Sequence, residues 1–273
     1  MSGQDVSWIA DTDVVWDDLP EDPARNMERD ATLGQMVAEG DRPPTIRLWR
    51  SGIAPGIAVS ARDVAGPRGE AARQALLREG IDVVVRQTGG TAVPQGEGVL
   101  HVSWLWPRTR VSVSIDAAYQ LLCHPLVGWL QALGVEATIG PLPGSYCDGR
   151  HNVLASGRKL AGTAQAWRGG LAGVASARPG YVLAHACLMV DVDFAQATAW
   201  INHFYEEAGD AYRVDPGTSV DLRHLLPRRF TNMSARDANV DSLESLRDFL
   251  MRWTQRDPRW RGQPMQATRE ESL

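Results

Sequence analysis

The sequence predicts an α+β domain, and three observations lead to this fold class. Apolar runs rich in β-branched residues follow one another across short turns, as in antiparallel strand pairs. Capped amphipathic segments lie between these runs without the regular strand–helix alternation of a parallel sheet. The 273 residues are 44% hydrophobic and 22% charged, which is ordinary for a globular chain of one large or two small domains.

Composition argues against several classes of protein. No stretch approaches the ~18 apolar residues that a membrane span needs, and Met1–Trp8 lacks the basic start and apolar core of a signal peptide. The three cysteines are widely spaced and odd in number, which argues against a disulfide framework and for a reducing compartment. The net charge of −5 argues against a nucleic-acid binder. We therefore expect a cytoplasmic protein with no membrane or nucleic-acid partner.

The first part of the chain is expected to be an acidic, solvated lead-in over residues 1–21. A helix follows, because Asp22 is a typical N-cap, Pro23 suits the first helical position and Gly40 is a typical end. The elements expected next are strands at Thr45–Trp49, Gly56–Ser60, Ile81–Val85 and Val99–Leu105, a helix at Arg68–Glu79, and a glycine-rich loop at Gln87–Gly98.

The second part is predicted to begin with a long helix that Gly134 ends, followed by a group of strands and then by helices. The expected elements are a helix at Ser114–Leu133, a strand at Val135–Ile139, a loop at Pro141–Gly149, strands at His151–Ala155, Arg158–Trp167 and Tyr181–Val190, and helices at Phe194–Ala208 and Asp241–Gln255.

Lys159 is the one lysine among 28 basic residues, and the other 27 are arginine. A genome whose base composition favours arginine codons explains the arginines, and the one lysine is then retained either by chance or for function. Arginine cannot deprotonate and presents a planar fork, whereas lysine is a compact point charge whose pKa can be tuned. A reaction that needs those properties would keep a lysine, so Lys159 is a candidate functional residue.

Cys147 is the cysteine whose surroundings suggest chemistry. Its neighbours include glycine, serine, aspartate and arginine, whereas Cys123 and Cys187 lie in the apolar patterns typical of buried cysteines. A loop thiol near cationic groups has a depressed pKa and reacts as a thiolate. Lys159 or His151 supplies the positive charge if the loop folds back on the next strand. His151 is also a possible base, with an ordinary loop histidine as the alternative.

No zinc-type ligand set is formed by the scattered histidines and cysteines, so we expect no metal site.

The strand at Arg158–Trp167 carries small residues that leave room for a ligand, or for a helix packed closely on the sheet. Ser156-Gly157 is a reasonable tight turn before it. Because side chains alternate along a strand, we expect one face to hold Lys159, Ala161, Thr163 and Gln165. The other face should hold Leu160, Gly162, Ala164 and Ala166.

Gly89-Gly90 directly follows a predicted strand. Two such glycines bring backbone N–H groups close to an anionic or carbonyl ligand, with a flexible turn as the alternative. Neither GxGxxG nor GxxxxGK[ST] occurs here, so the loop is not a Rossmann or Walker loop.

Taken together, these stretches resemble the lipoate–protein ligase and octanoyltransferase family, which shares its fold with biotin protein ligases. The family's Arg-x-x-Gly-Gly-x-Ala-Val run is similar to Arg86–Val93. Its Gly-Arg-Lys-hydrophobe-(Ala/Ser)-Gly-x-Ala-Gln run is similar to Gly157–Gln165, with the active-site lysine at Lys159. The substrate-binding residues that the resemblance implies are Arg86, Gly89, Gly90, Thr91, Ala92, Val93, Ala161, Gly162, Thr163 and Gln165.

The resemblance also implies a domain organisation. We expect a biotin/lipoate protein ligase-like catalytic domain over residues 22–225, with a mixed, largely antiparallel sheet packed by helices, and a helical C-terminal extension over residues 226–273.

Two chemistries occur within the family, because ligases use ATP to make an acyl-adenylate whereas transferases carry the acyl group on a cysteine. The run Gly144–Gly149 resembles the cysteine-dependent branch, which contains octanoyltransferases acting from acyl carrier protein. That branch also contains amidotransferases acting from glycine-cleavage H protein, and GEGVLHVS resembles these most. The resemblance implies that Cys147 carries an octanoyl or lipoyl group to a lysine of H protein or of a 2-oxoacid dehydrogenase lipoyl domain. Lys159 then orients the carbonyl or shuttles a proton.

The sequence departs from the ligases at two places. Many ligases carry His-Asp where Gln95-Gly96 stands, and Asn-Asp where His151-Asn152 stands. Mg²⁺ prefers carboxylate ligands, so these departures favour a transferase that requires no cofactor over a ligase that uses ATP and Mg²⁺. The alternatives are an ATP-dependent lipoate–protein ligase and a non-catalytic module that binds lipoyl domains, octanoate or lipoate.

Overall fold

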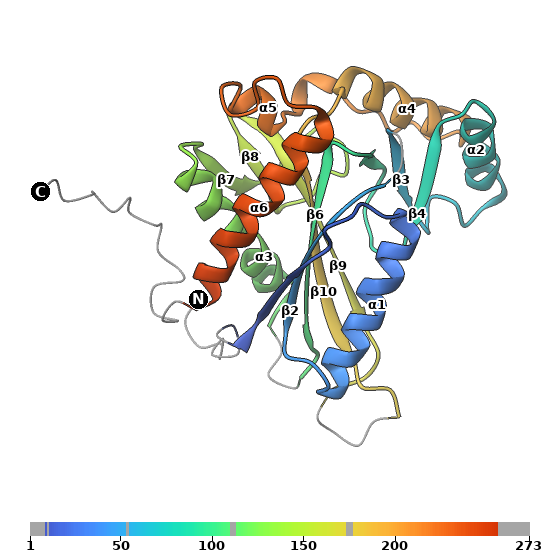
Figure 1. The fold of residues 1–273 in the computed structure, drawn as a ribbon. Helices are drawn as coiled ribbons and strands as arrows, with labels where there is room; N and C mark the ends of the chain where they lie inside the picture. Colours follow the sequence, from blue (N-terminus) through green and yellow to red (C-terminus); the bar gives the residue numbers. More distant parts are fainter. Residues whose placement is uncertain (1–8, 10, 53–54, 110–112, 173–176, 256–273) are drawn as a thin grey trace, which may run out of the picture.

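A mixed sheet of seven strands forms the centre of the structure (Figure 1). The structure is a computed structural model, and it describes residue 9 and residues 11–52, 55–109, 113–172 and 177–255. The strands are β1 (Asp13–Trp16), β2 (Thr45–Arg50), β3 (Gly56–Ser60), β4 (Asp82–Arg86), β5 (Val93–Gln95), β6 (Val99–Pro107), β7 (Ala137–Gly140), β8 (Asn152–Ala155), β9 (Arg158–Arg168) and β10 (Tyr181–Met189).

The large sheet has the order β1-β2-β6-β10-β9-β8-β7, and a three-stranded sheet has the order β4-β3-β5. The β1–β2 and β3–β4 pairs are parallel, and the other neighbouring strands are antiparallel. The predicted α+β fold with a mixed, largely antiparallel sheet is therefore confirmed.

Helices cover both faces of the large sheet (Figure 1). Helix α1 (Pro23–Glu39) lies over β6 and β10 on one face, while α3 (Ile115–Ala132) and α6 (Ala235–Thr254) share the main core on the other. Helices α2 (Pro67–Arg78) and α4 (Phe194–Glu207) pack around the small sheet. The 3₁₀ helix η2 (Pro216–Thr218) and the short α5 (Leu222–Leu225) follow α4.

The alternation of side chains along β10 separates the two faces of the sheet. We call the side under α1 the α1 face, and its residues on β10 are Tyr181, Leu183, His185 and Cys187. We call the other side the α3–α6 face, and its residues on β10 are Val182, Ala184, Ala186 and Leu188.

The predicted ends of α1 are confirmed. The Asp22 side chain accepts hydrogen bonds from the backbone N–H groups of Ala24 and Arg25, and Pro23 stands at the first helical position. Gly40 ends the helix with φ +85°, a left-handed conformation that glycine adopts without a Cβ penalty.

Two short strands were not predicted. Residues Asp13–Trp16, inside the expected solvated lead-in, form β1 at an edge of the large sheet and pair with β2. β5 lies inside the expected loop Gln87–Gly98, and its Pro94 is tolerated because β5 is an edge strand. Both strands have few residues, so their formation depends on a partner strand far along the chain rather than on local pattern.

The C-terminal helix α6 begins at Ala235, earlier than the expected Asp241. Its Leu246, Phe249 and Trp253 side chains lie in the main core. The division of the chain at residue 225 stays a prediction, and residues 256–273 of the expected extension lie outside the described residues.

Within the part of the chain that the structure describes, no helix has both the length and the apolar composition that crossing a membrane requires.

Candidate functional site

The loop between β7 and β8 holds Cys147 in an unusual backbone conformation. Its φ is +43°, a left-handed value that residues with a side chain rarely adopt. The residue is buried, with 9% of its surface exposed. Left-handed non-glycine residues persist where surrounding contacts enforce them, and they gather at functional sites. All three cysteines are free thiols.

The glycine loop after β4 packs directly against this thiol. Gly90 has φ +99°, and a Cβ placed there would overlap Sγ of Cys147. Gly89, by contrast, has open space where a Cβ would stand. The close approach of the loop to the sulfur therefore depends on Gly90.

Arg86 shapes the same loop. Its guanidinium donates to the carbonyl oxygens of Thr88, Gly89 and Thr91 and to the Thr88 hydroxyl. The Nη2 atom of Arg86 also lies 3.7 Å from Sγ of Cys147. Arg86, rather than Lys159 or His151, is thus the cation that contacts the thiol.

The backbone N–H of Cys147 donates to two hydroxyl oxygens, Thr91 Oγ1 at 3.0 Å and Tyr212 Oη at 3.0 Å. The Tyr212 hydroxyl in turn donates to the carbonyl oxygen of Ser145 at 3.0 Å. Sequence reasoning missed Tyr212, because it lies 65 residues from Cys147 in a segment without a motif.

Lys159 lies fully buried behind the same loop. Its Nζ donates to the carbonyl oxygens of Tyr146 and Cys147, the latter at 2.9 Å, and lies 4.3 Å from the centre of the Tyr146 ring. Burial lowers the pKa of the Lys159 ammonium to about 8, although the nearby Cys147 and Asp148 oppose the shift. The predicted approach of Lys159 to the cysteine loop is therefore seen, with backbone oxygens as its partners.

An irregularity in the β8–β9 pairing corrects the predicted faces of β9. Val153 pairs with Ala161, but Leu154 pairs with Lys159, so Leu160 is an extra residue on β9. Leu160 and Ala161 consequently both lie in the core on the α3–α6 face. Lys159 points to the opposite face, where its Cε would lie 3.3 Å from a Cβ at Gly162.

The expectation that Lys159 shares a face with Ala161, Thr163 and Gln165 is therefore wrong. Thr163 donates to the carbonyl oxygen of His151, and Gln165 donates to that of Ile115 at the start of α3. Ala161, Thr163 and Gln165 lie away from Cys147, on the α3–α6 face. Gly162 is the predicted binding residue of β9 that the structure brings to Lys159.

His151 is not brought to the thiol. Its ring stacks on Tyr119 with centroids 4.7 Å apart, and its Nε2 lies 3.6 Å from the Asp116 carboxylate. Both partners belong to α3, so the imidazole faces that helix. A role for His151 as a base stays a prediction without a contact to support it among the described residues.

The predicted binding residues Ala92 and Val93 are buried, and Val93 is the first residue of β5 in the small sheet. The N–H of Ala92 donates to the Tyr205 hydroxyl at 2.8 Å, which fixes the end of the glycine loop to α4.

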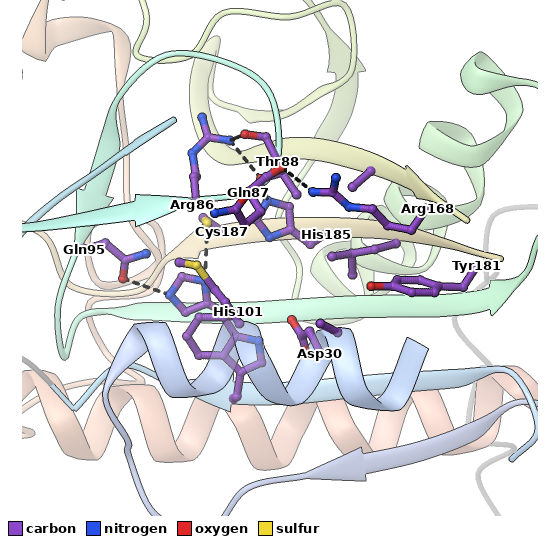
Figure 2. A pocket seen from close by; sticks show the side chains of 15 residues that line it. Asp30, Arg86, Gln87, Thr88, Gln95, His101, Arg168, Tyr181, His185 and Cys187 are labelled. Atoms are coloured by element: carbon purple, nitrogen blue, oxygen red, sulfur yellow. Dashed lines mark hydrogen bonds between the residues drawn. The ribbon is translucent and has the colours of Figure 1, made fainter. Parts of the chain in front are cut away.

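A pocket of about 240 Å³ opens between α1 and the sheet, next to Arg86 (Figure 2). Its walls are mostly apolar or aromatic and come from α1, from the loop after β4, and from β2, β4, β5, β6, β9 and β10. The residues that line it are Met27, Asp30, Ala31, Trp49, Arg86, Gln87, Thr88, Gln95, His101, Ala166, Arg168, Tyr181, Leu183, His185 and Cys187. Arg86 joins the two parts of the site, because it both lines the pocket and contacts Cys147.

A row of polar groups crosses the inner wall of this pocket (Figure 2). Cys187 Sγ lies 3.4 Å from Nδ1 of His101, whose Nε2 lies 3.2 Å from Oε1 of Gln95. The amide oxygen of Gln95 only accepts, so Nε2 of His101 carries the proton and Nδ1 accepts from the thiol. In its order of contacts the row resembles a catalytic triad, with Cys187 at the place of a nucleophile, His101 at that of a base and Gln95 at that of the group that orients the base.

Burial keeps the row of Gln95, His101 and Cys187 uncharged. It raises the pKa of the Cys187 thiol to about 12 and lowers the pKa of His101 well below its usual range. Burial also lowers the pKa of His185, which bonds the Thr88 hydroxyl, to about 3. The row is thus a neutral, internally hydrogen-bonded wall, and the pattern of a buried cysteine expected for Cys187 agrees with its placement.

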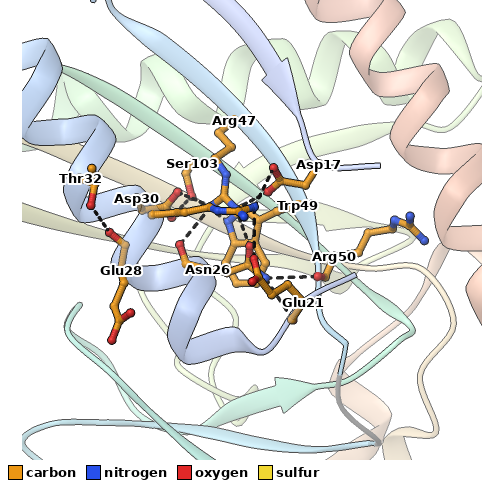
Figure 3. Close-up of polar contacts among 11 residues, drawn as sticks. Asp17, Glu21, Asn26, Glu28, Asp30, Thr32, Arg47, Trp49, Arg50 and Ser103 are labelled. Atoms are coloured by element: carbon orange, nitrogen blue, oxygen red, sulfur yellow. Dashed lines mark hydrogen bonds and ion pairs between the residues drawn. The ribbon is translucent and has the colours of Figure 1, made fainter. Parts of the chain in front are cut away.

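A buried ion pair fastens α1 beneath the pocket (Figure 3). Arg47 of β2 donates to the Asp30 carboxylate at 2.7 Å, and it also bonds Asn26 and Asp17. Ser103 of β6 donates to the second oxygen of Asp30. Burial raises the pKa of Asp30 even though Arg47 opposes the shift. These contacts hold the helical wall of the pocket against the sheet.

The positions where many ligases carry His-Asp do not supply carboxylates here. Gln95 is buried and pairs with His101, and Gly96 has φ +133°. Mg²⁺ prefers carboxylate oxygens, and no group of three His, Cys, Asp or Glu among the described residues is arranged to hold a metal ion. Gln95 and Gly96 therefore offer no carboxylate oxygen to a Mg²⁺ ion at this position.

Comparison with known proteins places the chain in a family. Residues 22–244 match the family model described as the lipoyl protein ligase A/B catalytic domain. An octanoyl-[GcvH]:protein N-octanoyltransferase of Kyrpidia tusciae is 42% identical over 217 residues, which are 78% of this chain and 73% of that protein. The protein of the same name from Anoxybacillus flavithermus is 30% identical over 77% of this chain and 74% of its own.

The fold is also shared with a solved structure. The crystal structure of a lipoate-protein ligase A bound with ATP has a TM-score of 0.63 and 19% identity, covering 89% of this chain and 83% of that one. The sequence matches over most of the chain, together with this fold, show that the chain belongs to the lipoyl protein ligase A/B catalytic domain family.

Proposed function

We propose that this chain is an octanoyl-protein acyltransferase in which Cys147 carries the octanoyl group as a thioester. The observation that supports this most directly is the setting of Cys147: a left-handed loop residue whose sulfur lies against Gly90 and Arg86. The names of the relatives support glycine-cleavage H protein as the octanoyl donor. The acceptor is a lysine of a 2-oxoacid dehydrogenase lipoyl domain, and acyl carrier protein is the second donor to be tested.

The transfer consists of two displacements at one carbonyl carbon. The Cys147 thiolate attacks the octanoyl amide, the C–N bond breaks, and the departing lysine amine of the donor takes a proton. The acceptor amine then attacks the thioester, the C–S bond breaks, and the amine gives up a proton as the thiolate leaves. A group with a pKa of about 8 exchanges protons effectively near neutral pH, which suits Lys159 to this part of the reaction.

The acyl chain occupies the pocket between α1 and the sheet in this proposal. Its volume of about 240 Å³ lies below the ~300–1,000 Å³ typical of drug-sized ligands. Such a space suits a slender, unbranched chain. The Trp49 ring, which stacks on His101 with centroids 3.7 Å apart, and the Leu183 side chain supply apolar surface for it.

The test is the intact mass of the protein after exposure to octanoyl-H protein without ATP. We expect an increase of one octanoyl group, which hydroxylamine removes and which Cys147→Ser lacks. Parallel samples with octanoyl carrier protein and with lipoyl-H protein identify the donor and the acyl group. An adduct on Cys123 or Cys187, or an absolute requirement for ATP, would contradict the proposal. A Cys147 inert to donors and thiol reagents alike would favour a binding module.

A further inference from the structure

One connecting segment contacts the backbone at both Cys147 and Lys159. This connector, residues 208–221 between α4 and α5, runs beside the cysteine loop and then beside β9. Asp215 N donates to the carbonyl oxygen of Gly144 at 2.9 Å, and Val220 N donates to that of Lys159 at 2.9 Å. The proposed nucleophile and the buried lysine are therefore held by the same stretch of chain.

Tyr212 provides the side chain of this connector that reaches Cys147. Its hydroxyl donates to the carbonyl oxygen of Ser145, and it accepts from Cys147 N and, at 3.1 Å, from Thr91 Oγ1. A phenol has one proton and two acceptor positions, so these three bonds use its full capacity. Burial raises the pKa of Tyr212, which keeps the hydroxyl protonated and able to donate.

The Cys147 backbone needs such contacts, because its left-handed φ is sparsely populated by residues with a side chain. On one side of the residue, Tyr212 and Thr91 hold the N–H; on the other, Lys159 holds the carbonyl oxygen. A peptide fixed at both ends directs the side chain, so Sγ is kept in the narrow space between Gly90 and Arg86.

We propose that Tyr212 is a positioning residue for acyl transfer: with Thr91, its hydroxyl holds the Cys147 backbone so that Sγ stays at the acyl carbonyl rather than turning toward solvent. The effect of Tyr212 on acyl transfer rests on the proposed function, whereas its effect on the position of Cys147 Sγ does not depend on any acyl donor.

Tyr212→Phe tests it, because the ring stays and the hydroxyl is lost. We expect acyl transfer in single turnover to slow by about 10- to 100-fold, the scale of a misplaced reacting group, while the half-saturating donor concentration stays within about twofold. Alkylation of Cys147 by iodoacetamide should accelerate by about two- to tenfold, the range that one neutral hydrogen bond contributes. Cys123 and Cys187 should remain unlabelled, which shows that the release is local.

Tyr205→Phe is the matched control. It removes a buried hydroxyl that accepts from Ala92 N, one residue from Thr91, but that has no hydrogen bond to Cys147. Its melting temperature should fall at least as much as that of Tyr212→Phe, while alkylation of Cys147 stays within about twofold of wild type because the N–H of Cys147 keeps both acceptors.

Variants of Thr91 provide a second test if Tyr212→Phe does not fold. Thr91→Val removes the other acceptor of the Cys147 N–H, whereas Thr91→Ser keeps a hydroxyl there, so Cys147 should be alkylated faster in Thr91→Val than in Thr91→Ser. Combined with Tyr212→Phe, Thr91→Val leaves that N–H without a partner, so the loss of acyl transfer should exceed the product of the two single effects.

The proposal is overturned if Tyr212→Phe folds and matches wild type in both alkylation and transfer, or if only the half-saturating donor concentration rises. If wild-type protein is never acylated, the proposed function fails, but the alkylation comparison still decides whether Tyr212 positions Cys147.

Discussion

Lys159 is held as a compact cation by two backbone carbonyls, and this limits what can replace it. We expect Lys159→Arg to be nearly inactive, because a guanidinium is longer and planar, unlike the compact ammonium that lies beside Gly162 and Tyr146, and it cannot release a proton. Loss of general acid–base help corresponds to about 10²–10⁴-fold in rate. Single-turnover kinetics are the suitable measurement. A variant within a few-fold of wild type would mean that the lysine serves only as a charge.

The two glycines of the loop after β4 form a natural pair for comparison. Gly90→Val should reduce acyl transfer far more than it lowers the melting temperature, because its Cβ would overlap Sγ of Cys147 and its φ is +99°. Gly89→Val meets open space, so alkylation of Cys147 should stay within about twofold of wild type. If the two substitutions change the alkylation of Cys147 equally, Gly90 has no special role in the approach of the loop to the sulfur.

At the scale of elements, the buried pair of Arg47 and Asp30 joins α1 to β2. Asp30→Asn should lower the free energy of unfolding by about 3–5 kcal/mol, because it leaves a buried guanidinium without its most buried counter-charge. Asp17→Asn touches the same arginine, but the Asp17 side chain is 23% exposed, so about 1 kcal/mol is expected. Urea unfolding of both variants measures the difference, and equal losses would show that burial does not set the strength of the pair.

Elements that local signals define were predictable, and those defined by distant partners were not. The N-cap Asp22 and the end at Gly40 were read correctly because capping involves neighbouring residues. β1 depends on pairing with β2, and the extra residue Leu160 depends on the register with β8. That one residue reversed the predicted side of Lys159, because alternation counts side chains only while pairing is unbroken.

The site was predictable to the same extent. The motifs identified Cys147, Arg86, Gly90 and Lys159 as candidates, and in the structure these residues lie around one loop. Tyr212 reaches this loop from a segment that only the folded chain brings near. The pocket likewise combines α1 with six strands, so its residues shared no pattern in the sequence.

At the scale of the whole molecule, the buried lysine couples stability to pH. The folded state has a Lys159 pKa of about 8, and the unfolded chain has one of about 10.4. Between about pH 8 and pH 10.4 the unfolded chain binds more protons than the folded one, so the free energy of unfolding rises with pH across this range. This gain in stability is fully present above about pH 10.4 and is lost as the pH falls through about 8. The difference in unfolding free energy between wild type and Lys159→Met should therefore grow by about 3 kcal/mol from pH 7 to pH 10.5. A pH-independent difference would contradict the depressed pKa.

The burial of the one lysine in this chain also determines how fast a protease that cleaves only after lysine cuts the native protein. The Lys159–Leu160 bond lies within β9, at its pairing with β8 and its bridge to Ser219, with both side chains fully buried. Cleavage there requires opening of the sheet itself. A single cut into residues 1–159 and 160–273 thus reports on opening of the chain at β9, and any ligand that binds the folded protein there should slow it.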